Sequence, residues 1–122
     1  MFQPRSAAFE KRWRRCLRAL RVECPTLLPV RVVRFREPGP VRMCAWAAVV
    51  EGGAGFRVVI RELVYERGAS RSRRMNDSEM IEVLMHEWAH CMAWHGGHSD
   101  LQDHSPAWGV AYSECYRAVI ED

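Results

Sequence analysis

The segment from residue 86 to residue 90 reads His-Glu-Trp-Ala-His, so two imidazoles flank a carboxylate. Because an α-helix turns once every 3.6 residues, His86 and His90 would lie one turn apart on one helix face. Two imidazole nitrogens at that spacing can bind one Zn²⁺ at about 2.0–2.1 Å each. Glu87 would lie beside the metal, where its carboxylate could take a proton from an activated water and pass it to a leaving amine. The pattern predicts a zinc site with Glu87 as the catalytic base.

The surroundings of this pattern argue against a chance arrangement. A motif with three fixed positions recurs by accident in many sequences. Here the neighbouring positions are mostly apolar, and polar side chains in an apolar helix need a partner or a role. These neighbours are Met80, Val83, Leu84, Met85, Trp88, Ala89, Cys91 and Met92. We therefore interpret the segment as a metal site.

A catalytic zinc ion usually has three protein ligands, so a third must follow His90 in the chain. The longer metzincin pattern would need Gly and His where this chain has Ala93 and Gly96. We favour His104, because it directly precedes the expected start of the last helix, where its position is well fixed. Glu114 would instead give a site of two histidines and one glutamate. The full set of candidates is His95, His98, Asp103, His104 and Glu114.

The N-terminal half predicts a helix followed by a sheet. Apolar residues recur at helical spacing over residues 8–22, with basic residues on the remaining surface. Residues 30–36 alternate β-branched and Arg side chains, which is typical of a strand. Residues 42–50 and 56–65 predict two more strands, joined by a glycine-rich turn. The economical interpretation is a meander of three antiparallel strands, with one edge strand free to pair with an extended peptide.

Two further helices are expected around the metal site. Asn76, Asp77 or Ser78 can cap a helix that continues to about Trp94. Ser105 and Pro106 are suited to the N-cap and first position of a last helix. Aromatic residues in this half are interpreted mainly as packing groups, although Tyr112 and Tyr116 could stabilise an oxyanion. The tryptophans among them are Trp88, Trp94 and Trp108. Together these elements predict a single α+β domain over residues 1–122.

The net charge of +3 conceals a strong asymmetry. Residues 1–74 hold 17 of the 18 Lys and Arg against six acidic residues, whereas residues 75–122 hold only Arg117 against nine. Residues 67–76 predict an exposed basic loop without regular structure. A basic surface on this half could bind DNA weakly through phosphate contacts. The loop residues that would take part are Arg71, Arg73 and Arg74.

Composition also bears on location. With 48% hydrophobic and 27% charged residues, the chain has the composition of a globular protein. The longest apolar run, residues 43–50, is well short of the ~18 residues that cross a bilayer. We expect no membrane partner, and a cytoplasmic location because the first residues lack a secretory pattern. The five cysteines contain no C-x-x-C pair, so we expect reduced, mostly buried thiols.

The stretch 80–108 combines several features in a fixed order. An apolar lead-in precedes His-Glu-Trp-Ala-His, Trp94 follows four residues later, and Asp-His-Ser at 103–105 is followed by an aromatic residue. This order resembles the core of SprT-like metallopeptidases, in which H-E-x-x-H precedes an aromatic and then Gly-His-Gly with a further aromatic. The resemblance implies a small zincin-like fold, a Zn²⁺ cofactor and a protein or peptide substrate. The zinc ligands that it implies are His86, His90 and His104, with Glu87 as the base.

The same residues allow a different class of function. The chain could be a nucleic-acid- or protein-binding module that keeps a structural zinc ion, in which Glu87 would have no catalytic role. A closed shell of four protein ligands would favour that alternative. A metal-dependent hydrolase with a non-peptide substrate is a second alternative, because one site can serve several reactions.

Overall fold

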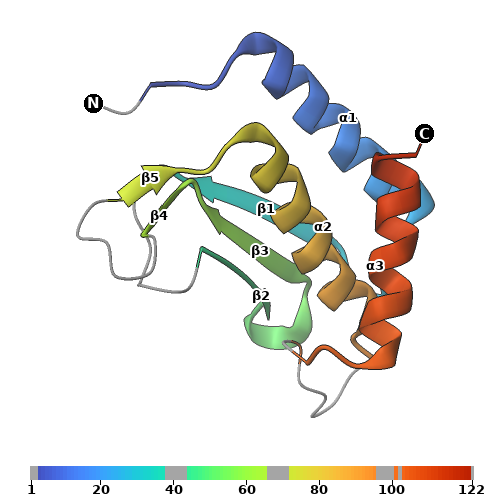
Figure 1. Cartoon of the computed structure of the whole chain (residues 1–122). Helices are drawn as coiled ribbons and strands as arrows, with labels where there is room; N and C mark the ends of the chain where they lie inside the picture. Colours follow the sequence, from blue (N-terminus) through green and yellow to red (C-terminus); the bar gives the residue numbers. More distant parts are fainter. Residues whose placement is uncertain (1–2, 38–43, 66–71, 96–100, 102, 122) are drawn as a thin grey trace.

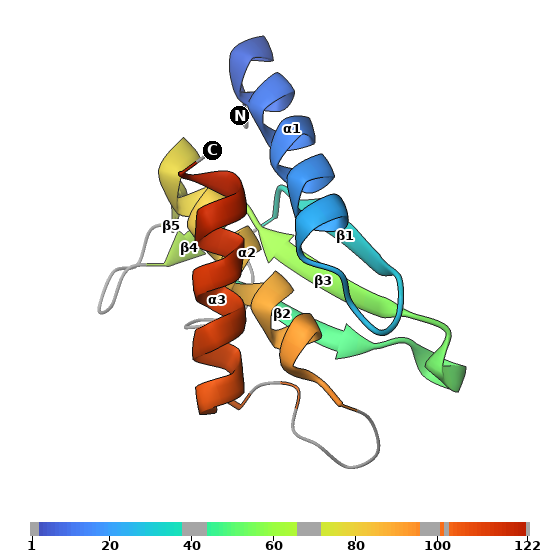
Figure 2. The same ribbon diagram turned by 90° about the vertical axis from the view of Figure 1, so that its right-hand side faces the viewer.

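The protein is described from a computed structural model, which covers residues 3–37, 44–65, 72–95, 101 and 103–121. Three helices lie over one face of a three-stranded sheet (Figure 1). The view turned by 90° shows the sheet behind the helices and a smaller pair of strands at one end (Figure 2). The α+β class expected from the sequence is therefore confirmed.

The first helix, α1 (Ala7–Glu23), matches the helix predicted over residues 8–22. Its N-cap is Ser6, whose side chain accepts a hydrogen bond from the backbone of Phe9 at 3.0 Å. The helix ends at Cys24, directly before Pro25, which cannot continue it. Its buried side chains recur at helical spacing and turn toward the other helices and the sheet. They are Phe9, Trp13, Cys16 and Leu20.

The main sheet consists of β1 (Val30–Phe35), β2 (Ala45–Val49) and β3 (Phe56–Arg61), in the order β1-β3-β2. A short 3-10 helix (Glu51–Gly53) joins β2 to β3, with Gly52 and Gly53 at positive φ. β2 pairs antiparallel with β3, as predicted, but β1 pairs parallel with β3. The predicted antiparallel meander is therefore wrong, and the sheet is mixed.

The central position of β3 has a physical reason. β3 is the most buried strand of the main sheet, with four of its six side chains buried, whereas every side chain of β1 is half-buried or exposed. Placing β3 between two neighbours buries it on both edges. Because β3 lies between β1 and β2, the segment that connects β1 to β2 must cross two strand spacings, or ~10 Å. That segment has enough residues to span this distance. Its predicted Pro-Gly-Pro break at 38–40 lies outside the described residues.

The strand predicted over residues 56–65 is interrupted at Glu62. β3 ends at Arg61, and β4 (Leu63–Tyr65) leaves the main sheet to pair antiparallel with β5 (Ser72–Arg74). The backbone of Glu62 bridges the two parts, because its N–H donates to Phe35 and its carbonyl accepts from Met75. The prediction of an irregular loop over residues 67–76 is wrong for β5, and residues 67–71 lie outside the described part.

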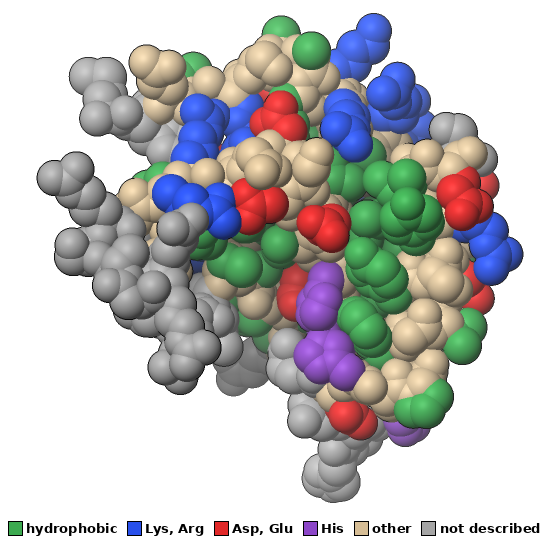
Figure 3. Space-filling view, viewed as in Figure 1, with side chains coloured by type: hydrophobic (Ala, Val, Ile, Leu, Met, Phe, Trp, Pro, Cys, Tyr) green, Lys and Arg blue, Asp and Glu red, His purple; other side chains and the backbone are tan. Residues whose placement is uncertain are grey.

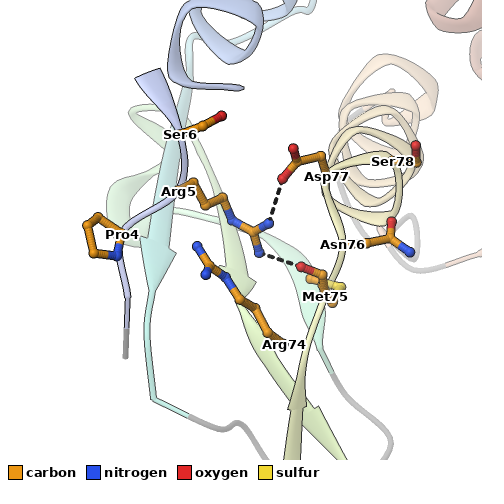
Figure 4. A pocket seen from close by; sticks show the side chains of 8 residues that line it. All are labelled: Pro4, Arg5, Ser6, Arg74, Met75, Asn76, Asp77 and Ser78. Carbon is orange, nitrogen blue, oxygen red and sulfur yellow. Dashed lines mark hydrogen bonds and ion pairs between the residues drawn. The ribbon is translucent and has the colours of Figure 1, made fainter. Parts of the chain in front are cut away.

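A buried ion network explains why Glu62 interrupts the strand. The Glu62 carboxylate accepts hydrogen bonds from Arg5 and from Arg34. Arg5 also donates to Asp77 at 3.0 Å and to the carbonyl of Met75 at 2.7 Å (Figure 4). The side chains of Arg5 and Glu62 are both only 3% exposed. The network ties the segment before α1 to the sheet and to the start of the next helix.

The two remaining helices match their predicted starts. In α2 (Asp77–Ala93), Asn76 and Glu79 form a reciprocal capping box. In α3 (Pro106–Val119), Ser105 is the N-cap and accepts from the backbone of Trp108. α2 packs against β2, β3 and α3, and α1 packs against both other helices. The core is formed where these surfaces meet.

Two expectations about the whole chain can be compared with the structure. All five cysteines are free thiols and four of them are buried, as predicted. Within the described residues, no helix is both long and apolar enough to span a membrane.

Candidate metal centre

α2 carries His86, Glu87 and His90, and many of its other side chains are buried in the core. Seven of its apolar side chains are buried against the rest of the fold. They are Met80, Ile81, Leu84, Met85, Trp88, Ala89 and Cys91. Trp88 also donates a hydrogen bond to the carbonyl of Cys24 at 2.9 Å, which fixes α2 against the end of α1. The polar face of α2 is therefore held in a defined orientation.

Three histidines converge at this face. The Nε2 atom of His86 lies 3.3 Å from Nε2 of His90 and 3.1 Å from Nε2 of His104. All three ligand atoms lie within 4.8 Å of one another. His90 is buried, His86 is partly exposed and His104 is exposed, so the cluster opens to solvent on one side. These three residues could hold a metal ion.

Hydrogen bonding alone does not account for this convergence. A neutral imidazole nitrogen has either one proton or one lone pair, each directed along the ring plane. Nε2 of His86 therefore cannot form a well-directed hydrogen bond with His90 and with His104 at the same time. Three imidazole nitrogens within 4.8 Å of one another could instead be held together by a metal ion.

Burial and charge also favour neutral ligands. The pKa of His86 is lowered because burial disfavours its charged form, and the nearby charge of His104 lowers it further. A neutral imidazole is the form that binds metal. The same burial that assembles the site thus keeps one ligand in its binding form.

Glu87 lies beside the histidines without joining their cluster. Its Oε1 atom is 3.9 Å from Nε2 of His86. The residue is buried, and its Oε2 atom accepts no hydrogen bond from any residue in the described part of the chain. Burial raises the pKa of Glu87 to about 7. A buried carboxyl group without a partner is costly to a fold, and such groups concentrate at functional sites.

The predicted alternatives for the third ligand that lie in the described part of the chain do not join the cluster. Glu114 is exposed on α3 and acts electrostatically on Cys24 and Cys115 instead. His95 is exposed, and its Nδ1 atom lies 3.3 Å from the carbonyl of Ala93. Asp103 is exposed beside His104 and is not one of the clustered groups, while His98 lies outside the described residues.

Trp108 is a site residue whose role the sequence did not reveal. Its ring lies 4.9 Å from His86, 5.6 Å from His90 and 4.7 Å from His104, measured between ring centroids. Its Nε1–H donates to the carbonyl of His86 at 3.2 Å. Trp108 was expected only to pack, as Trp94 does against Phe56. The available signal was its spacing, because it follows His104 by four residues across a helix start.

The two tyrosines considered as oxyanion stabilisers have different surroundings. Tyr112 stacks on Trp108 with 5.4 Å between ring centroids, so it supports the wall of the site. Burial raises the pKa of Tyr112, and the charge of Glu82 raises it further. Tyr116 is 43% exposed on α3. Neither forms a hydrogen bond with the histidines in the described residues.

Two of the arginines proposed for DNA binding, Arg73 and Arg74, lie in β5, directly before the N-terminal end of α2. Both terminal nitrogens of Arg73 bind the Glu79 carboxylate, at 2.8 and 2.7 Å. Arg74 is a half-buried residue of β5, and Arg71 lies outside the described residues. DNA binding through Arg71, Arg73 and Arg74 stays a prediction.

The surface view shows which kinds of side chain lie around the candidate metal centre. Histidine side chains reach the surface next to a band of hydrophobic side chains, while Lys and Arg gather toward the upper edge of the same face (Figure 3). Comparisons with protein-family models, with curated proteins and with solved structures found no match. The functional assignment therefore depends on the geometry of the site.

Proposed function

We propose that this chain is a zinc-dependent metallopeptidase of the SprT-like, zincin-like type. The observation that carries the proposal is the convergence of three histidine Nε2 atoms beside a buried carboxylate that has a free oxygen. His86, His90 and His104 would hold the ion, and Glu87 would act as the general base.

The spacing of the histidines supports zinc. Two ligand atoms that bind a tetrahedral ion at about 2.0–2.1 Å lie about 3.3 Å from each other. The distances from Nε2 of His86 to the other two nitrogens are 3.3 and 3.1 Å, which fit this value, and all three ligand atoms lie within 4.8 Å of one another. Imidazole also binds copper, iron and nickel, so the metal content must be measured. When bound, zinc would polarise the scissile carbonyl and lower the pKa of a water molecule toward ~7.

Glu87 has the position and the chemistry of a proton carrier. Its Oε2 atom has no partner in the described residues, so it can accept a proton from the attacking water. The pKa of about 7 allows the same carboxyl group to release that proton to the leaving amine near neutral pH. Trp108 excludes water from one side of the histidines and holds the backbone of His86.

A peptide substrate is favoured by the neighbouring strand. β2 is an edge strand of the sheet, and α2 packs against it. An extended peptide could approach the β2 side of the sheet and so lie along the metal centre. The substrate's sequence is not specified by this arrangement, because backbone pairing is independent of side chains.

The alternative is a binding module with a structural metal ion. Structural zinc sites are usually closed by four protein ligands. In the described part of the chain, only three side chains join the cluster, and one of them is exposed. A set of three protein ligands is the one that catalytic zinc sites use, which favours catalysis over a purely structural role.

The test is metal analysis combined with hydrolysis of an unfolded general protease substrate such as casein. We expect about one equivalent of zinc in the purified protein. Glu87→Gln should keep the metal and lose hydrolysis, because Glu87 is not a ligand. Full activity in Glu87→Gln would exclude the mechanism.

A matched control lies on the same helix. Glu82→Gln removes one carboxylate from an exposed position about one turn before His86. It should leave both metal content and hydrolysis nearly unchanged. Equal losses in Glu82→Gln and Glu87→Gln would indicate a general effect of charge instead of a catalytic base.

A further inference from the structure

A cavity lies beside the candidate metal centre. It has a volume of about 250 Å³, and residues from the C-terminal end of α2 and from the segment before α3 line it. His90, one of the three clustered histidines, is part of this lining. Pockets that enclose a whole small molecule usually have about 300–1,000 Å³. The cavity is therefore better suited to one side chain of a larger ligand.

The lining of the cavity combines apolar and polar groups. Ala93, Trp94 and Leu101 contribute apolar surface, and all three side chains are half-buried. The ring of Trp94 is fixed by an edge-to-face contact with Phe56, with 5.3 Å between the ring centroids. Long side chains with a charged end lay their aliphatic stem along apolar surface of this kind and keep the charge at the rim. The shape and chemistry of the cavity suit such a side chain.

Asp103 contributes the one carboxylate among the described lining residues. Its side chain is exposed, and it forms no ion pair with any residue in the described part of the chain. No Lys or Arg is among the described residues that line the cavity. The carboxylate of Asp103 is therefore available to a cationic ligand.

The position of Asp103 in the sequence is also informative. Asp103 and Ser105 flank His104, where the SprT-like pattern has two glycines, so side chains here distinguish this chain from the pattern that it resembles. Ser105 has a structural role, because its hydroxyl caps α3 by accepting from the backbone of Trp108. Asp103 makes no comparable contact among the described residues. Its role is better explained by a ligand than by the fold.

The charge of the surrounding part of the chain favours a cationic ligand as well. Residues 75–122 hold nine acidic residues, and Arg117 is their one Lys or Arg. In the surface view, an acidic side chain lies next to the histidine side chains (Figure 3). Charges of one sign around a cleft raise the local concentration of ligands of the opposite sign.

We propose that this cavity binds a Lys or Arg side chain of the peptide substrate, at a position next to the bond that is cut. The aliphatic stem lies along Ala93, Trp94 and Leu101. The cationic group pairs with the carboxylate of Asp103, which is thus a specificity-determining residue. The inference rests on the proposed peptidase function, and it adds the class of substrate, namely chains with accessible basic side chains.

The experiment measures cleavage by the full chain with zinc bound. A mixed peptide library, analysed by mass spectrometry, identifies the bonds that are cut, and Lys or Arg should be enriched at one position beside them. Two peptides are then compared that differ only at that position, where one has Lys and the other has norleucine, which keeps the aliphatic stem without the charge. The ratio of their kcat/KM values measures the selectivity for the charge, and this ratio should decrease as salt is added.

Substitutions of two lining residues separate charge from shape. Asp103→Asn should lower the selectivity ratio about 2- to 5-fold, because exposed ion pairs are weak. Asp103→Lys should reverse the preference, so that a peptide with Glu at this position is cut faster than one with Lys. Ala93→Leu narrows the cavity and should slow cleavage of the Lys and norleucine peptides relative to a peptide with Ala. Leucine is a good helix former, so this change suits the end of α2.

A charge-matched control lies on α3. Glu114→Gln removes one exposed carboxylate that is not part of the described lining, and it should leave the selectivity ratio unchanged. The zinc content and circular dichroism of every variant are measured, because Asp103 directly precedes His104. If Asp103→Asn loses zinc, Ala93→Leu decides the question, since Ala93 is not adjacent in sequence to a clustered histidine.

A binding measurement does not depend on hydrolysis. Glu87→Gln should keep the metal and leave the peptides intact, so anisotropy of the fluorescent peptides gives their affinities. The Lys peptide should bind more tightly than the norleucine peptide. Adding Asp103→Asn to this variant should remove most of the difference.

The outcomes separate this inference from the proposed function. Cleavage without a preference for Lys or Arg beside the cut bond would overturn the inference and leave the peptidase. A preference that stays the same in Asp103→Asn and in Asp103→Lys, or that changes equally in Glu114→Gln, would also overturn it. If no peptide is cut, the peptidase is excluded. Binding of the Lys peptide that depends on Asp103 would then still assign the cavity to basic side chains, and its absence would overturn both proposals.

Discussion

Each end of α2 has a cluster of ionisable side chains, and the two clusters differ in how far their polar atoms are hydrogen-bonded. At the N-terminal end, Arg5 binds three acceptors, and the Glu62 carboxylate is bound by two arginines. At the C-terminal half, three histidine nitrogens face one another and Glu87 has a buried oxygen without a partner among the described residues. Each set contains buried groups, namely Arg5 and Glu62 in the first and Glu87 and His90 in the second.

The difference is the one expected between a structural polar cluster and a cluster that could hold a metal ion. Buried polar groups that satisfy one another hold elements together and leave no capacity for a ligand. Buried polar groups that remain unsatisfied destabilise the fold unless a ligand completes them. We therefore expect changes at the N-terminal end to act on stability, and changes at the other end to act on metal binding.

The largest expected effect is on stability at the N-terminal end. Arg5→Met would leave the Glu62 carboxylate buried beside Arg34 alone, and breaking a buried ion pair in this way costs about 3–5 kcal/mol. The free energy of unfolding in urea, measured with metal present, gives the change. Arg14→Met, at an exposed position of α1, should change stability by less than about 0.5 kcal/mol. A similar loss of stability in both variants would show that the ion network contributes no more to the free energy of unfolding than an exposed arginine does.

The next effect concerns the third metal ligand. His104→Ala should weaken zinc binding by well over ~10-fold, because it removes a ligand and not only a neighbour of one. Glu114→Ala should leave zinc affinity nearly intact, since Glu114 does not join the cluster. Competition with a chromophoric chelator measures both affinities. The reverse result would assign the site to two histidines and a glutamate.

A smaller effect is expected from the wall of the metal centre. Trp108→Phe keeps an aromatic ring against the three histidines but removes the hydrogen bond to the carbonyl of His86. Loss of such a supporting contact should weaken zinc affinity by about 10-fold. Val110→Ala, at a 60% exposed position of the same helix, is the control and should have no measurable effect. Unchanged zinc affinity in Trp108→Phe would reduce Trp108 to a packing role.

The smallest effect is expected from the exposed ion pair at the start of α2. Hydrogen bonds from Arg73 lower the pKa of Glu79 to about 2, and the backbone N–H of Asn76 contributes. A carboxylate with a lowered pKa stabilises the fold above its ordinary pKa near 4.5, and this contribution is lost as the pH falls toward 2. Because the pair is largely exposed, its coupling energy at pH 7 should be only about 0.2–1 kcal/mol.

A double-mutant cycle of Arg73→Gln and Glu79→Gln isolates this coupling, because glutamine at position 79 can still form the capping box. Urea unfolding at pH 7 and at pH 3 should give a smaller coupling energy at the lower pH. A coupling energy that grows as the pH falls would contradict the assignment.

Local signals in the sequence predicted the helices well. Asn76 and Ser105, which were among the predicted caps, are capping residues in the structure, and the helix boundaries lie within a few residues of those expected. Caps and helical periodicity depend on residues close together in the chain, so they are visible without tertiary contacts. The hairpin between β2 and β3 was predicted for the same reason.

Local signals in the sequence could not predict the order of the strands in the sheet. The hydrophobic pattern of β1 is compatible with either direction of pairing, and the rule that consecutive strands are neighbours favoured the wrong arrangement. Glu62 looked like one more residue of a strand, because its partners Arg5 and Arg34 are 57 and 28 positions away. Pairings between distant residues leave no local pattern.

By itself the sequence determined that His86 and His90 share one face of a capped helix, with Glu87 beside them, because helical geometry fixes residues four apart. Only the tertiary structure decided that His104, and not Glu114, completes the cluster, because this depends on how α3 packs against α2. The packing also placed Trp108 against all three histidines. Those features arise from contacts between helices and strands that are far apart in the chain, so no local sequence pattern predicts them.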